Sequence, residues 1–66
     1  MSVAKTVEIV SSSTGGIEAA IREGIAKASE TVKGIEGAWV KDTELVVRDG
    51  KVTEWRVRLA VTFVVK

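Results

Sequence analysis

The chain has 66 residues, of which 45% are hydrophobic, and it contains no cysteine and no histidine. This composition excludes a disulfide framework and argues strongly against a structural zinc site. Ten basic and nine acidic residues give a net charge of +1, which argues against nucleic-acid binding because that function needs a concentrated basic surface. A chain this short buries only about 60% of its unfolded surface, so we expect oligomerisation to stabilise it.

The sequence also carries no sign of secretion or of a membrane span. Residues 1–10 contain Lys5 and Glu8 and no long apolar run, unlike a signal peptide. No stretch approaches the roughly 20 apolar residues of a membrane-spanning helix. We therefore expect a soluble, cytoplasmic protein, and the lack of cysteine is compatible with a reducing compartment.

The first half of the chain predicts a strand followed by a helix. Residues 3–10 alternate β-branched and polar residues, which indicates a strand, and the small residues of segment 11–16 end it. Residues 17–33 predict a helix, with Gly34 as the left-handed residue that follows it. Gly24 within this helix indicates close packing on the sheet. The helix carries one apolar stripe, formed by Ile17, Ile21, Ile25, Ala28 and Val32.

The second half predicts a long β-hairpin. Residues 38–48 and 51–66 read as strands, and Asp49-Gly50 between them is typical of a two-residue type I′ turn. The second of these strands alternates cleanly between an apolar and a mixed face, as in an antiparallel sheet with one covered face. We predict an α+β fold for the single domain 1–66: a β-α-β-β subunit with a three-stranded antiparallel sheet in strand order 1-3-2, wrapped on one helix.

A two-residue loop fixes the hairpin register and assigns side chains to the two faces. Trp39 is predicted opposite Ala60, and Lys41 opposite Arg58, on the face that the helix leaves open. Asp42 then falls on the helix-covered face, as does the neighbouring Glu44. A shift of one residue would reverse these assignments, because successive strand residues point to opposite faces.

Five segments, taken in order, resemble a known family: VEIVSSS, IEAAI, AKASETVKGI, DGKV and RLAVTFVV. The sequence is similar over nearly its whole length to the dodecins, small flavin-binding proteins of β-α-β-β topology that assemble as hollow dodecamers. The resemblance implies a flavin-binding and storage protein that acts as a homo-dodecamer, with riboflavin or FMN as its ligand. None of the segments is a catalytic motif, and we expect no enzymatic activity.

The resemblance also assigns flavin contacts, some of them to altered positions. The tryptophan that stacks on the flavin ring in flavin-binding members falls at Gly37, and the glutamine at the ring's polar edge falls at Arg56. Asp42 matches an aspartate that contacts the sugar-like chain, and a nearby glutamate is replaced by Val46. Some members without the tryptophan have been described as binding calcium. The alternative is therefore a flavin-free cage with a structural or interfacial calcium-binding role.

The two tryptophans have different interpretations. Trp39 lies two residues beyond Gly37 and so on the same sheet face. It is either a displaced aromatic platform for a planar ligand or an anchor in a subunit interface, where tryptophan is enriched. Trp55 lies on the apolar face of its strand, which indicates packing in the core or in an interface.

Charged residues of the hairpin also allow two interpretations. Arg56 and Arg58, beside Lys41, are suited to receive the phosphate of a nucleotide-type ligand, because guanidinium binds phosphate through paired hydrogen bonds. Alternatively, they form salt bridges to carboxylates of neighbouring subunits.

A calcium site is the remaining possibility for the acidic residues of the hairpin. Asp42, Glu44 and Asp49 supply carboxylates, but calcium requires six to eight oxygen ligands. Such a site would therefore have to form between subunits, and solvated or salt-bridged carboxylates are the simpler expectation.

Overall fold

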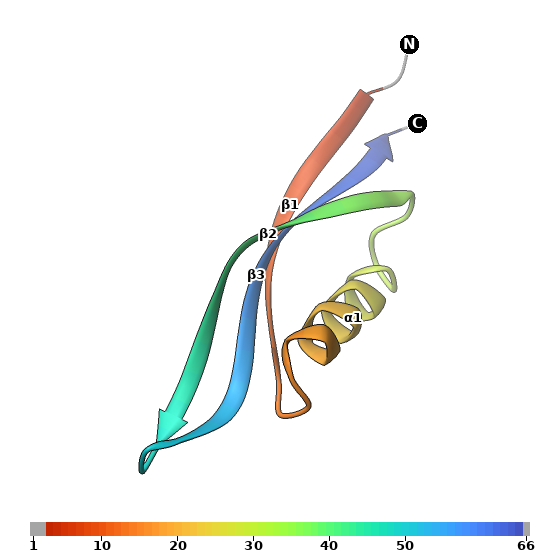
Figure 1. Cartoon of the computed structure of the whole chain (residues 1–66). Coiled ribbons are helices and arrows are strands. Elements are labelled where there is room, and N and C mark those ends of the chain that lie inside the picture. Colours follow the sequence, from red (N-terminus) through yellow and green to blue (C-terminus); the bar gives the residue numbers. More distant parts are fainter. Residues whose placement is uncertain (1–2, 66) are drawn as a thin grey trace.

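The computed structural model describes residues 3–65, which form a β-α-β-β unit (Figure 1). The elements are β1 (Val3–Ser13), α1 (Ile17–Ala28), β2 (Ile35–Arg48) and β3 (Lys51–Val65). The strands form one antiparallel sheet in the order β1-β3-β2. The predicted α+β fold class and strand order are confirmed. Within the described residues, no helix has the length and apolar character that a membrane crossing requires.

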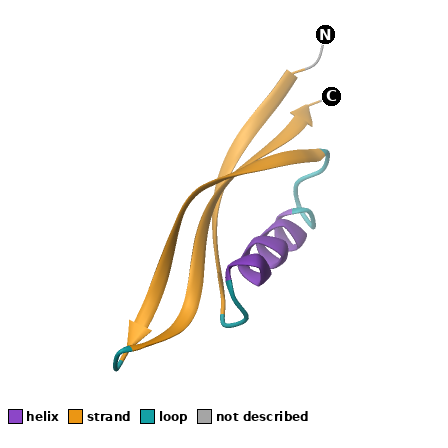
Figure 2. Ribbon diagram, in the orientation of Figure 1, coloured by secondary structure: helices purple, strands orange, loops and turns teal. Residues whose placement is uncertain are grey.

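The core lies between α1 and one face of β1 and β3 (Figure 2). β3 is the central strand, and alternate residues of it turn toward the helix, as its sequence pattern predicts. Fully buried are Ala20, Val57, Leu59 and Val61. Isoleucines surround them: Ile9, Ile17, Ile21, Ile25 and Ile35. We call the opposite side of the sheet the open face.

The helix is shorter than the sequence predicts, because it ends at Ala28 and not at residue 33. The Thr31 amide donates to the carbonyl of Ala28 at 3.2 Å, a backbone bond that spans three residues and tightens the last turn. The Ser29 hydroxyl donates to the carbonyl of Ala26 at 2.8 Å, and local side-chain bonds of this kind compete with regular helical bonding.

Gly34 adopts the predicted left-handed conformation, with φ of 76°, but it does not end the helix. It stands directly before β2, and its carbonyl accepts a hydrogen bond from the amide of Val64 at 3.0 Å. A Cβ at this position would lie 3.1 Å from the Val64 carbonyl oxygen. Glycine therefore satisfies both the backbone angle and the close approach to β3.

The hairpin turn is as predicted, but the ladder beyond it contains bulges. Asp49 and Gly50 both have positive φ, 52° and 75°, which confirms the two-residue turn. Thr53 is then an extra residue in β3, and Lys41 is an extra residue in β2. The two insertions lie on opposite strands and cancel, so the predicted pairing returns beyond Lys41.

Between the two bulges, the predicted pairing was wrong. Asp42 lies opposite Arg58 and Glu44 opposite Arg56, on the open face. A regular ladder would have placed Lys41 opposite Arg58, and like charges directly opposite each other are unfavourable. The observed register gives each arginine a carboxylate partner instead.

Gly24 lets the helix approach β1 closely, as its sequence position predicts. A Cβ added there would lie 2.8 Å from the Cβ of Ser11. The Ser11 hydroxyl in turn donates to the helix carbonyl of Ala20 at 2.7 Å. The contact between α1 and β1 therefore leaves no room for a methyl group.

Gly24→Ala is expected to destabilise the protein by about 1–3 kcal/mol through overpacking. The sign is informative, because alanine normally stabilises a helix interior by roughly 1 kcal/mol relative to glycine. The shift in the urea unfolding midpoint measures the effect. Gly37→Ala is the matched control, since its Cβ would meet the Thr62 hydroxyl at an ordinary 3.5 Å. A Gly24→Ala protein that resists more urea than the parent would contradict the prediction.

Candidate functional site

The open face of the sheet is ordered in rows that run across β1, β3 and β2. Each row takes one residue from each strand, and neighbouring rows are two residues apart along β3. The three central rows are Glu8, Ala60 and Trp39; Val10, Arg58 and Asp42; and Ser12, Arg56 and Glu44. The exposed Trp39 thus shares its row with Glu8 and stands next to the row of Arg58 and Asp42.

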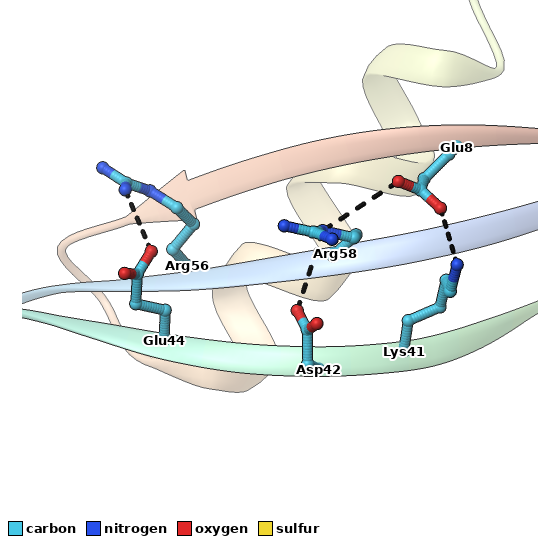
Figure 3. A network of polar contacts seen from close by, with 6 residues as sticks. All are labelled: Glu8, Lys41, Asp42, Glu44, Arg56 and Arg58. Atoms are coloured by element: carbon cyan, nitrogen blue, oxygen red, sulfur yellow. Dashed lines mark hydrogen bonds and ion pairs between the residues drawn. The ribbon is translucent and has the colours of Figure 1, made fainter.

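Glu8 links all three strands through the charges around it (Figure 3). Its carboxylate accepts a hydrogen bond from Lys41 Nζ at 2.8 Å. Its other oxygen lies 3.9 Å from Arg58 Nε, which is itself 3.8 Å from Asp42 Oδ1. Lys41 reaches across β3 because, as the bulge residue, it lies on the same face as Asp42.

Arg56 has its own pair of partners in the next row. Its Nη1 donates to Glu44 Oε1 at 3.1 Å, and its Nε donates to the hydroxyl of Ser12 at 3.1 Å. The sequence predicted salt bridges from Arg56 and Arg58 to carboxylates of neighbouring subunits, but the structure places their carboxylate partners in the same chain. These side chains are about half exposed, and ion pairs of this kind contribute roughly 0–1 kcal/mol each.

The charges around Glu8 keep its carboxyl group ionised. The hydrogen bond from Lys41 lowers the pKa of Glu8 below the ordinary value of 4.5. Loss of solvent around the carboxyl group opposes this and raises the pKa, while the positive charges of Lys41 and Arg58 lower it further. Glu8 is thus negatively charged at neutral pH and holds both cations on the open face.

Trp39 is a prominent aromatic platform, with 70% of its surface exposed. Its cross-strand neighbour is Ala60, which has a small side chain, and Gly37 stands two residues away on the same strand. The Thr62 hydroxyl donates to the Gly37 carbonyl at 3.1 Å and lies next to this platform. The exposed indole therefore offers a surface on which a planar aromatic molecule can stack, while polar groups stand in the adjoining rows.

The five site residues predicted from the sequence all belong to the open face. They are Gly37, Trp39, Asp42, Arg56 and Arg58. The sequence prediction missed Glu8, which β1 contributes. The sequence indicated only that Glu8 occupies a polar position of an alternating strand. It could not show which residues Glu8 faces, because no tight turn connects β1 to β3 and fixes their register.

The acidic residues of the hairpin do not form a cation site within one chain. Asp42 and Glu44 face arginines, and Asp49 lies in the turn. Within residues 3–65, no three acidic, histidine or cysteine side chains gather as a potential metal site.

Comparisons with known proteins place this fold in one family. The dodecin family profile matches residues 3–66. The chain is similar to the dodecin from Streptomyces davaonensis, with 29% identity, 98% and 96% of the two chains covered, and a TM-score of 0.94. It is also similar to the tt0972 protein from Thermus thermophilus, with 33% identity, 100% and 97% covered, and a TM-score of 0.94. Comparison with curated proteins found no match. The chain belongs to the dodecin family.

Proposed function

We propose that the protein binds and stores flavin, riboflavin or FMN, as a hollow homo-dodecamer, with the flavin ring stacked on Trp39. Storage of this kind is a binding function and requires no catalytic group. Family membership supports the flavin as ligand and the dodecamer as assembly. In this proposal Asp42, Arg56 and Arg58 make polar contacts to the ligand, and Gly37 leaves space beside the ring.

The observation that carries the proposal is the exposed indole of Trp39. Contact of so large an apolar side chain with water is unfavourable, and 70% of the Trp39 surface is exposed. A bound partner that covers the indole would remove this cost. Tryptophan stacks well on planar heterocycles because it is large and rigid. Its neighbours on the open face, Gly37 and Ala60, have no or small side chains that do not cover the indole.

The uncovered apolar surface of the subunit supports assembly. Val40 and Leu45 lie on the helix side of β2 but are 48% and 51% exposed, because α1 packs on β1 and β3. The accessible surface of 4835 Å² also exceeds the roughly 4,100 Å² expected for a compact monomer of this mass. Neighbouring subunits would cover this excess.

One observation favours a second candidate, a flavin-free cage with a structural or interfacial calcium-binding role. Arg56 stands where the resemblance expects a ring-edge contact, yet Glu44 and Ser12 already engage its guanidinium. Gly37 likewise supplies no aromatic surface of its own. In this alternative, Trp39 anchors a subunit interface.

The two candidates are separated by titrating riboflavin and FMN with the purified protein, while its mass in solution is measured by light scattering. Saturable quenching of flavin fluorescence by a particle about twelve times the 7.1 kDa chain mass is the expected result. The same particle without quenching would refute flavin storage in favour of the flavin-free cage. A monomer would refute both candidates.

A further inference from the structure

The charges at the centre of the open face are balanced within each chain. Three cations and three carboxylates lie in the three central rows and at the bulge residue Lys41, and each of these cations has a carboxylate oxygen within 4 Å. The pairs are Lys41 with Glu8, Arg56 with Glu44, and Arg58 with Glu8 and Asp42. This central part of the face therefore offers many hydrogen-bonding atoms but no net positive charge.

A balanced face is poorly suited to a phosphate group. A phosphate monoester carries a charge of about −1.5 to −2 at pH 7 and binds where cations stand free to receive it. Here it would have to displace Glu8 from Lys41 or Glu44 from Arg56, and the displaced carboxylate would remain close by. At Arg58 it would bind beside the carboxylates of Glu8 and Asp42, which lie within 4 Å of the guanidinium. Repulsion from these carboxylates offsets much of the attraction that the cation supplies.

The same face is well suited to a neutral chain of hydroxyl groups. Arg58 Nε lies 3.8 and 3.9 Å from its two carboxylate neighbours, beyond hydrogen-bonding distance. Donors of the guanidinium and acceptors of Asp42 thus remain available side by side. A hydroxyl both donates and accepts, so it satisfies both kinds of group without breaking an ion pair.

The distance along the sheet places such a chain within reach of the aromatic platform. The row of Arg58 and Asp42 is next to the row of Trp39. The two rows are two residues apart along β3, which is about 7 Å. A ring stacked on Trp39 would direct a substituent a few bonds long over that row. The face thus joins an aromatic subsite to a subsite of alternating charge.

We propose that this face selects flavins whose side chain ends in a neutral polyol over flavins that end in phosphate. The inference rests on the proposed flavin storage and names its ligand class. The charge-balanced network contacts the polyol of the ligand, while Trp39 stacks on its ring. The ion pairs on which this preference rests all lie within one subunit.

The test compares three ligands by fluorescence quenching at constant ionic strength: riboflavin, FMN, and lumiflavin, which has the ring without the polyol. Riboflavin is expected to bind at least 10-fold more tightly than FMN and several-fold more tightly than lumiflavin. FMN affinity should rise between pH 7.5 and pH 5.5, as the phosphate loses its second charge near pH 6, and riboflavin affinity should rise less.

Asp42→Asn tests the network itself, because it leaves Arg58 with a less compensated charge. This variant is expected to narrow the ratio of riboflavin to FMN affinity by several-fold. Asp49→Asn is the matched control, because it removes the same charge from the turn and outside the network. It should leave the ratio unchanged.

The outcomes separate this inference from the function on which it rests. FMN binding as tight as riboflavin would overturn the inference and leave flavin storage in place. If lumiflavin bound as tightly as riboflavin, the inference would also be overturned and flavin storage would stand, because the network would then make no contact with the polyol. Binding of none of the three ligands would overturn flavin storage, and the inference with it.

Discussion

Trp39→Ala is expected to weaken flavin binding by about 10- to 100-fold, because stacking of a planar heterocycle on an aromatic side chain contributes roughly 1–3 kcal/mol. Fluorescence titration of the variant measures the loss. The fold should be unaffected, since 70% of the Trp39 surface is exposed and little packing is removed. Far-UV circular dichroism and the urea midpoint should therefore match the parent protein.

Controls distinguish a ligand platform from an interface anchor. Trp39→Phe retains an aromatic face and should keep most of the affinity. Trp55→Phe alters a tryptophan on the other face of the sheet and should leave flavin binding unchanged. Unchanged affinity of Trp39→Ala would place the ring elsewhere. Loss of affinity together with a fall in particle mass would identify Trp39 as an interface anchor.

Leu59→Ala is expected to have the largest effect on stability, a loss of about 2–5 kcal/mol. Leu59 has no exposed surface and lies between β3 and the helix, so its removal leaves a cavity among Val57, Val61 and Ala20. A domain of this size has only a few kcal/mol of stability to lose. The variant should be largely unfolded by circular dichroism at room temperature.

The chain contains one other leucine, which serves as the matched control. Leu45 is 51% exposed in the subunit, so Leu45→Ala removes the same atoms from a much less packed position. It should preserve the circular dichroism spectrum. A Leu59→Ala protein as resistant to urea as Leu45→Ala would show that the core does not centre on Leu59.

The fold was predictable because its main signals are local. Alternation along β3 identifies the central strand and its buried face, and Asp49-Gly50 identifies the turn. The end of the helix was not predictable from its apolar stripe, because Val32 continues the pattern beyond Ala28. Beyond Ala28 the backbone includes bonds that span three residues, such as the one from the Thr31 amide to the Ala28 carbonyl, and the apolar stripe does not mark this change.

The candidate site was predictable in its residues but only partly in its geometry. Trp39, Arg56 and Arg58 face one side as expected, while Asp42 shares that side only because of a bulge at Lys41. A bulge adds one residue and has no marker in the sequence comparable to a turn. The sequence did contain one sign of the bulge: a regular ladder would have placed Lys41 directly opposite Arg58, which is unfavourable for two cations.

The bulges also make the two outer edges of the sheet unequal. β1 pairs with β3 without interruption from Val3 to Ser13, whereas β2 carries irregularities at Glu36 and Lys41. A regular outer strand presents an even row of free backbone groups, on which a strand of another molecule can add. On β2, the irregular spacing of these backbone groups and the charge of Lys41 make the addition of another strand unfavourable. The distortion that brings Lys41 to Glu8 therefore also protects the β2 edge from aggregation where many copies are crowded together.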